Sequence, residues 1–111
     1  MIDYKQIQSE LTGYLQNIFN NNLQKIILYG SYARNEEMYD SDIDFFVLTD
    51  LSDIEIRKIE KDITFISTEL SLKYNIVISV IAVNSDHYNK YLNFLPFYKS
   101  ISNDGIELYG K

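Results

Sequence analysis

Two aspartates lie one residue apart in a segment that otherwise predicts a buried strand. Asp42 and Asp44 flank Ile43 in the segment SDIDFFVLT, residues 41–49. Side chains alternate between the two faces of a strand, so both carboxylates are predicted on one face, with Cα atoms about 6.5 to 7 Å apart. Two such charges repel each other unless a cation lies between them. The pair is therefore a candidate site for a hard divalent cation such as Mg²⁺ or Mn²⁺.

A Gly-Ser pair ten residues before the acids is a second candidate binding element. Gly30 and Ser31 follow the apolar segment KIILY, residues 25–29. Glycine allows a sharp turn and lets a ligand approach the backbone. If residues 31–35 form a first helical turn, free N–H groups and the Ser31 hydroxyl can donate to a phosphate. Arg34 lies on the same turn, where it either reaches the phosphate or braces the acidic loop.

Together these two elements predict a class of chemistry. Phosphate donors at the end of one strand and paired carboxylates on the next are typical of metal-assisted phosphoryl or nucleotidyl transfer. In such a site Mg²⁺ bridges a triphosphate and neutralises the charge that develops on the leaving pyrophosphate. The protein supplies geometry and charge and does little covalent chemistry of its own.

Half of the acidic residues gather around this motif. Eight of the sixteen Asp and Glu residues fall between residues 36 and 55, a stretch without Lys or Arg. A solvated acidic loop on an α/β domain without catalytic function would have the same composition. It is the structural alternative to a metal site.

The remaining composition narrows the classes of function. With no Cys and a single His in 111 residues, a metal would be held largely by carboxylates. The net charge of −6 argues against direct nucleic-acid binding, which needs clustered Lys and Arg. No apolar run approaches the roughly 20 residues of a membrane span, and the N-terminus lacks a leader, so we expect a cytoplasmic protein. The length fits a single domain, residues 1–111.

Hydrophobic periodicity predicts the elements that carry these motifs. Apolar residues three and four apart predict a helix that Asp3 caps and that ends near residues 20–22. The same spacing predicts a second helix, from an Asp53 N-cap to about Lys73. Short apolar segments predict strands at residues 25–29, 43–49, 76–83 and 106–109, with short helices to about Phe94 and at 97–102. This order implies an α/β sheet with helices packed against it.

The segment IVISVIAV, residues 76–83, is almost purely apolar and β-branched. Such a composition suits a central strand that is covered on both faces. Ser85 or Asp86 then caps the helix that follows.

The motif resembles a known family. Gly30-Ser31, ten residues, then Asp42-Ile43-Asp44 before apolar residues resembles the nucleotidyltransferase superfamily that includes DNA polymerase beta. The fuller text GSYAR…SDIDFFV is similar to its minimal nucleotidyltransferase branch, MNT. The resemblance implies a nucleotidyltransferase fold, an α/β fold with a small mixed β-sheet packed with α-helices. It also implies that Gly30 and Ser31 hold the nucleotide phosphates and that Asp42 and Asp44 bind Mg²⁺ and act in catalysis. Arg34 is a further candidate for nucleotide binding because of its position on the same turn.

The sequence departs from the family at one position. The family usually presents a third carboxylate on a later strand, but the corresponding segment YNIVISV, residues 74–80, contains no acid. Ser79 lies inside the predicted strand, could face the site, and marks the possible third-acid position. Either Glu69 or Asp86 reaches in from a helix end, or activity is weak or absent.

The resemblance leaves several functions open. It implies Mg²⁺-dependent transfer of a nucleoside monophosphate, AMP from ATP, onto a hydroxyl of a HEPN-type toxin, which would make the protein an antitoxin. One alternative is a catalytically degenerate MNT-like module that neutralises its partner by contact alone. Another is an aminoglycoside-type nucleotidyltransferase with a small-molecule acceptor. Self-association also stays open.

Overall fold

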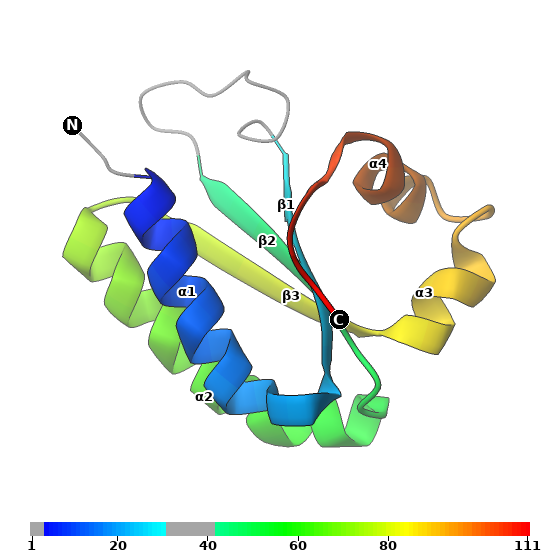
Figure 1. Cartoon of the computed structure of the whole chain (residues 1–111), viewed down its shortest axis with the longest axis horizontal. Helices are drawn as coiled ribbons and strands as arrows, with labels where there is room; N and C mark the ends of the chain where they lie inside the picture. The colour runs from blue at the N-terminus through cyan, green and yellow to red at the C-terminus, as the bar shows by residue number, and fades with distance from the viewer. Residues whose placement is uncertain (1–3, 31–41) are drawn as a thin grey trace.

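The computed structural model describes residues 4–30 and 42–111 and contains one four-stranded sheet. The strand order is β3-β2-β1-β4 (Figure 1). β1 is antiparallel to both β2 and β4, whereas β2 and β3 are parallel, so the sheet is mixed as expected. The strands are β1 (Leu23–Tyr29), β2 (Ile43–Thr49), β3 (Ile78–Asn84) and β4 (Ile106–Gly110).

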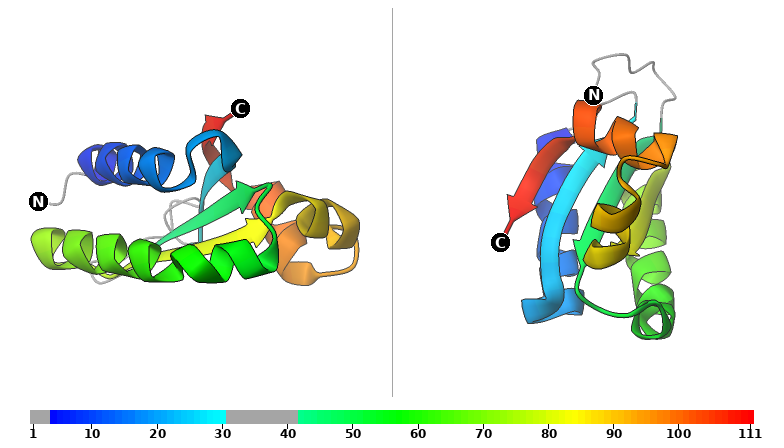
Figure 2. Two further views of the ribbon diagram at one scale, coloured as in Figure 1. Left: turned by 90° about the horizontal axis from the view of Figure 1, so that it is seen from below. Right: turned by 90° about the vertical axis from the view of Figure 1, so that its right-hand side faces the viewer.

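Helices cover both faces of this sheet. α1 and α2 pack on one face, and α3 and α4 pack on the other (Figure 2). The helices are α1 (Tyr4–Phe19), α2 (Asp53–Tyr74), α3 (Ser85–Tyr91) and α4 (Pro96–Asp104), with a 3-10 turn η1 (Asn20–Asn22) after α1. None of the helices within residues 4–30 and 42–111 is long and apolar enough to cross a membrane.

Two apolar clusters fill the space between the helices and the sheet. The larger lies under α1 and α2 and holds Phe19 and Phe45, which are almost fully buried. The smaller lies under α3 and α4 and centres on Phe46, which contacts the rings of Tyr88 and Tyr98. Because Phe45 and Phe46 point to opposite faces, β2, one of the two inner strands, contributes to both clusters.

The N-cap of α2 lies one residue earlier than the sequence predicts. The N-cap is Ser52, and Asp53 is the first helical residue. The Ser52 hydroxyl accepts from the Glu55 N–H at 3.2 Å, and the Glu55 carboxylate accepts from the Ser52 N–H at 3.0 Å. This capping box satisfies two backbone donors of the first turn, and an Asp53 cap would lack that reciprocal pair.

α3 also differs from its predicted bounds. Its N-cap is Asn84, not Ser85 or Asp86, and the Asn84 side chain accepts from the His87 N–H at 3.0 Å. The helix ends at Tyr91, three residues before the predicted end at Phe94.

β3 is an edge strand, so the prediction of a central strand is wrong. Only β2 lies beside it among the described residues, and Val77 and Ile81 are 56% and 40% exposed. Apolar β-branched residues suit central and edge strands alike, because the preference reflects packing on a pleated surface. The position of β3 follows from the crossover through α2, which returns the chain parallel to β2 on its outer side.

Candidate functional site

Asp44 lies at the start of β2, between residues of both neighbouring strands. In the sheet register it pairs with Tyr29 of β1 and with Ser79 of β3. Directly paired residues point to the same face of a sheet, so these three side chains lie on the α3–α4 face. That face is covered further along β2, where Phe46 and Leu48 pack under α3 and α4, and Asp44 itself is partly exposed.

Gly30 closes one side of this position. It ends β1 in the left-handed region, with φ of 78°, where side chains are rarely tolerated. A Cβ atom on Gly30 would lie 2.7 Å from Oδ2 of Asp44. The Asp44 carboxylate therefore occupies the space that a side chain at position 30 would need, which explains in physical terms why glycine follows Tyr29.

Asp42 lies immediately before β2 and is exposed. The pKa of Asp44 is raised above its ordinary value, first by burial and second by the negative charge of Asp42. This repulsion is the electrostatic effect expected of two carboxylates on one side of a strand. A cation near the pair would relieve it.

Tyr29 and Phe97 form an aromatic border beside Asp44. Their ring centroids are 5.6 Å apart, and each ring also contacts Phe46, at 6.3 and 5.8 Å. Burial, and secondarily the charge of Asp44, raise the pKa of Tyr29 to about 12. The Tyr29 hydroxyl therefore stays protonated at neutral pH.

Sequence reasoning missed both of these aromatic residues. Tyr29 could have been found, because it directly precedes Gly30 and ends the strand that the sequence predicts. Phe97 gives no such signal: it is 42% exposed in the first turn of α4 and reaches the site only through tertiary contacts.

Ser79 occupies the position predicted for a third acid. It is the register partner of Asp44 on β3. Neither proposed substitute lies near it. Glu69 is exposed on α2, which packs on the opposite face. Asp86 lies beyond Asn84, the last residue of β3, which is itself five residues, or about 17 Å along a strand, from Ser79.

The predicted site also includes residues of the segment between β1 and β2. Ser31 and Arg34 lie outside the described residues, so their nucleotide-binding function remains a prediction. Within the described residues, no three Asp, Glu, His or Cys side chains form a group that could hold a metal ion. Asp42 and Asp44 are therefore a pair without a third acidic ligand in that part of the chain.

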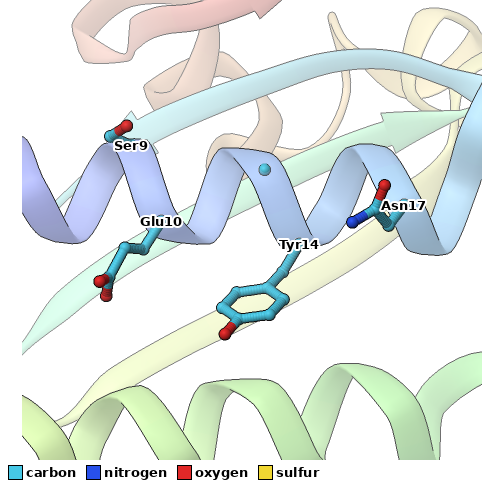
Figure 3. Close-up of a pocket in the computed structure, with 5 residues that line it drawn as sticks. Ser9, Glu10, Tyr14 and Asn17 are labelled. Atoms are coloured by element: carbon cyan, nitrogen blue, oxygen red, sulfur yellow. The ribbon is translucent and has the colours of Figure 1, made fainter.

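Two surface hollows lie elsewhere, along α1. One, of about 260 Å³, is lined by Ser9, Glu10, Gly13, Tyr14 and Asn17 (Figure 3). A second, of about 550 Å³, shares Ser9 and Gly13 with it and extends to Leu108 of β4. α1 packs on the face opposite to Asp44. Neither hollow contains a pair of acids, so the acid pair is the better candidate for chemistry.

Known sequences similar to this chain are described as nucleotidyltransferases or adenylyltransferases. A model of the family described as Polymerase beta, Nucleotidyltransferase matches residues 10–111. MJ0604 of Methanocaldococcus jannaschii is 32% identical over 100 residues, which cover 90% of this chain and 92% of that protein. MJ0141 of the same organism is 31% identical over 103 residues, which cover 93% of this chain and 96% of that protein. Both are provisionally named protein adenylyltransferases.

Solved structures share the fold at lower identity. The toxin-antitoxin with AMP-PNP superposes with a TM-score of 0.51 and 20% identity, covering 89% of this chain and 73% of that chain. A mutant of the toxin-antitoxin MntA-HpeT superposes with a TM-score of 0.55 and is 19% identical in sequence. The match covers 94% of this chain and 73% of that chain. At these identities the similarity shows the fold alone.

The family model covers most of the chain, and both curated relatives exceed 30% identity over nearly their whole length. The fold, a mixed four-stranded sheet between helices, agrees with these matches. As the resemblance implies, the chain belongs to the polymerase beta family of nucleotidyltransferases.

Proposed function

We propose that this protein transfers AMP from ATP to a hydroxyl group of a protein partner, with Mg²⁺ or Mn²⁺ bound by Asp42 and Asp44. The observation that carries the proposal is the closeness of Gly30 and Asp44, which brings a strand-end backbone and one carboxylate of the pair to one place. This closeness supports the proposal, because nucleotidyl transfer requires the phosphate-binding and metal-binding groups to be adjacent.

The residues present fit a hard divalent cation. Carboxylate oxygens are the ligands that Mg²⁺ and Mn²⁺ prefer. Partial burial, and secondarily repulsion from Asp42, raise the pKa of Asp44, and a bound cation would offset that penalty. When bound, the ion would stabilise negative charge on the transferring phosphoryl group and the leaving pyrophosphate.

The chain's own residues supply the rest of the site. Gly30 has no side chain, so a phosphate can approach the backbone beside Asp44. Ser31 and Arg34 are proposed to donate to the phosphates of the nucleotide. Ser79 is neutral and a poor base, so this chain contributes little to removing the proton of the acceptor hydroxyl from that position.

We further propose that the partner is a HEPN-type toxin and that the protein is its antitoxin. The support is indirect: two relatives are named protein adenylyltransferases, and structures with this fold are toxin-antitoxin complexes. The names of these relatives favour a protein acceptor over a small molecule such as an aminoglycoside. A nucleotide donor and a toxin partner both favour the cytoplasm.

A second candidate function is neutralisation of the partner by contact alone. One observation favours it: among the described residues, no third acid joins Asp42 and Asp44. The two candidates share a partner and differ in whether a nucleotide is transferred.

Labelled nucleotide separates the two functions. The protein is incubated with MgCl₂, a candidate partner encoded by a neighbouring gene, and ATP labelled at its α-phosphate. We expect label on the partner, and none with the double variant Asp42→Ala, Asp44→Ala. A wild-type protein that binds the partner tightly yet transfers no label would establish the contact-only function. Label that appears on an aminoglycoside and never on protein would refute both.

A further inference from the structure

The two edge strands of the sheet, β4 and β3, differ in length, register and charge. β4 is a short edge strand of five residues, and its pairing with β1 is interrupted by a register shift between Ile26 and Ile27. Glu107 places a charge on it and forms an ion pair with Lys25 at 3.2 Å. Short length, irregular register and charge are devices that prevent edge strands from pairing with other chains.

β3 has none of these devices. It is seven residues long, and its register with β2 runs from Ile78 to Asn84 without a shift. No charged residue and no proline occurs between Tyr74 and Ser85. An edge of this kind is open to pairing with another strand.

The backbone of β3 presents unpaired groups to its outer side. Ile43 donates to the Val77 carbonyl at 2.9 Å, so the odd-numbered residues of β3 bond to β2 and the even-numbered residues face outward. The first outward N–H, of Ile78, is bound by the Ser71 hydroxyl at 3.0 Å. The outward groups of Val80 and Ala82 have no hydrogen-bond partner among the described residues.

Exposed apolar side chains accompany these backbone groups. Ile81 is 40% exposed and Val77 56% exposed, on the face that carries Ser79. Val80 and Ala82 face the larger cluster under α1 and α2 but stay partly exposed as well, so the helices leave this edge partly open. A second strand beside β3 would cover the exposed side chains on both faces of this edge.

We propose that β3 pairs antiparallel with β3 of a second copy of this chain, about a two-fold axis at Ile81. In this register Val80 of one copy bonds to Ala82 of the other, which uses the unpaired outward groups. Ile81 packs against Ile81 of the second copy at a non-hydrogen-bonded pair, where side chains lie closest. The result is one continuous eight-stranded sheet and a closed, isologous dimer.

The charge distribution favours a second copy as the occupant. The chain carries a net charge of −6, so two copies repel each other over most of their surfaces. The β3 edge is uncharged from Tyr74 to Ser85. Every pair in the proposed register, from Val77 opposite Ser85 to Ile81 opposite itself, is therefore neutral. The pairing is also self-complementary, because an antiparallel strand pair has two-fold symmetry.

The test is the mass of the full-length protein in solution, measured by sedimentation equilibrium across micromolar concentrations. We expect the wild type to have twice the chain mass of 13.1 kDa. Ile81→Lys should be monomeric, because two lysines would meet at the axis. Ala82→Pro should be monomeric too, since it removes an outward N–H while leaving the bonds to β2 in place.

Ile106→Lys is the matched control, because Ile106 is 45% exposed on β4, the other edge. It should remain dimeric, and circular dichroism should show that all three variants are folded. A monomeric wild type would overturn the proposal, even if β3 then bound a strand of another protein. A dimer that only Ile106→Lys dissociates would overturn it as well. Neither outcome depends on nucleotidyl transfer.

Discussion

The Asp44 carboxylate occupies the space that a side chain on Gly30 would need. A Cβ atom there would lie 2.7 Å from Oδ2 of Asp44, and Gly30 has a φ of 78°. Two separate constraints, backbone conformation and contact with an acid, therefore require glycine at the end of β1. This contact joins the two halves of the candidate site, and most of the predictions below concern it or its neighbours.

Gly30→Ala should impair both folding and transfer. The strained conformation costs about 1 to 3 kcal/mol of folding free energy, and the new methyl group displaces the Asp44 carboxylate. We expect a loss of transfer of at least about 10-fold, which corresponds to about 1.4 kcal/mol. Thermal unfolding and the labelled-ATP assay measure the two effects separately.

Gly13→Ala is the control for that experiment. Gly13 is inside α1, and a Cβ atom there meets nothing within 4 Å. The substitution should stabilise the protein by about 0.5 to 1 kcal/mol through helix propensity, with transfer unchanged. Equal transfer rates for the two variants would contradict the proposed importance of the contact between Gly30 and Asp44.

Asp44→Asn should stabilise the metal-free protein at neutral pH while abolishing transfer. The pKa of Asp44 is raised in the folded protein, so its ionisation opposes folding. Below the Asp44 pKa of the unfolded chain, about 3.9, the carboxyl is protonated in both states and does not affect stability. As the pH rises through the higher Asp44 pKa of the folded protein, the free energy of unfolding of the wild type falls. Urea unfolding in EDTA should show a variant advantage at pH 7 that disappears near pH 3.5.

Added MgCl₂ should reverse this order. Bound cation stabilises the wild type by mass action, whereas the neutral amide of the variant holds it less well. If Mg²⁺ raised the stability of both proteins equally, Asp44 would not be a metal ligand.

Ser79→Asp should increase Mg²⁺ affinity and the rate of transfer. Ser79 is the register partner of Asp44, so an aspartate there adds a carboxylate on the same face. The same change should lower metal-free stability, because it adds a third negative charge beside Asp42 and Asp44. Calorimetric titration with Mg²⁺ and the labelling assay measure the gain.

Ser79→Asn provides the matched neutral control. It has nearly the size of aspartate, so any effect of volume appears in both variants. A gain in Mg²⁺ affinity that the asparagine variant shares would show that charge at this position is irrelevant.

Phe97→Ala should destabilise the fold and weaken transfer together. Phe97 contacts Tyr29 and Phe46 at ring distances of 5.6 and 5.8 Å. Loss of these aromatic contacts should cost about 1 to 3 kcal/mol of folding free energy. Phe94→Ala is the control, because Phe94 is 75% exposed and should cost less than about 0.5 kcal/mol. Urea unfolding of both variants gives the comparison.

Glu10→Gln should loosen the packing of α1 against α2. Glu10 accepts hydrogen bonds from Lys73 at 2.6 Å and from Tyr74 at 2.8 Å, and these bonds lower its pKa. The stabilisation is therefore present above the unfolded pKa of about 4.3 and is lost as pH falls through the folded pKa. Thermal unfolding should show a lower Tm for the variant at pH 7, and this difference should shrink as the pH is lowered below about 4.3. A difference that does not change with pH would indicate a cause other than the charge.

Local patterns in the sequence predicted most of the elements. The bounds of β2 were predicted to the residue, because SDIDFFVLT contrasts sharply with its polar surroundings. The end of α3 and the N-cap of α2 were wrong by a few residues, since several polar residues compete for a cap and only the folded backbone selects one.

The sequence alone determined that the acid pair lies at the start of a strand, with Asp42 immediately before β2 and Asp44 within it, because the apolar run that follows is a local signal. It also determined that glycine ends β1. Only the tertiary structure decided that Ser79 is the register partner of Asp44, that Phe97 borders the site, and that β3 is an edge strand. Strand order and register depend on contacts between segments that are distant in the sequence, and the local hydrophobic pattern of one segment does not predict those contacts.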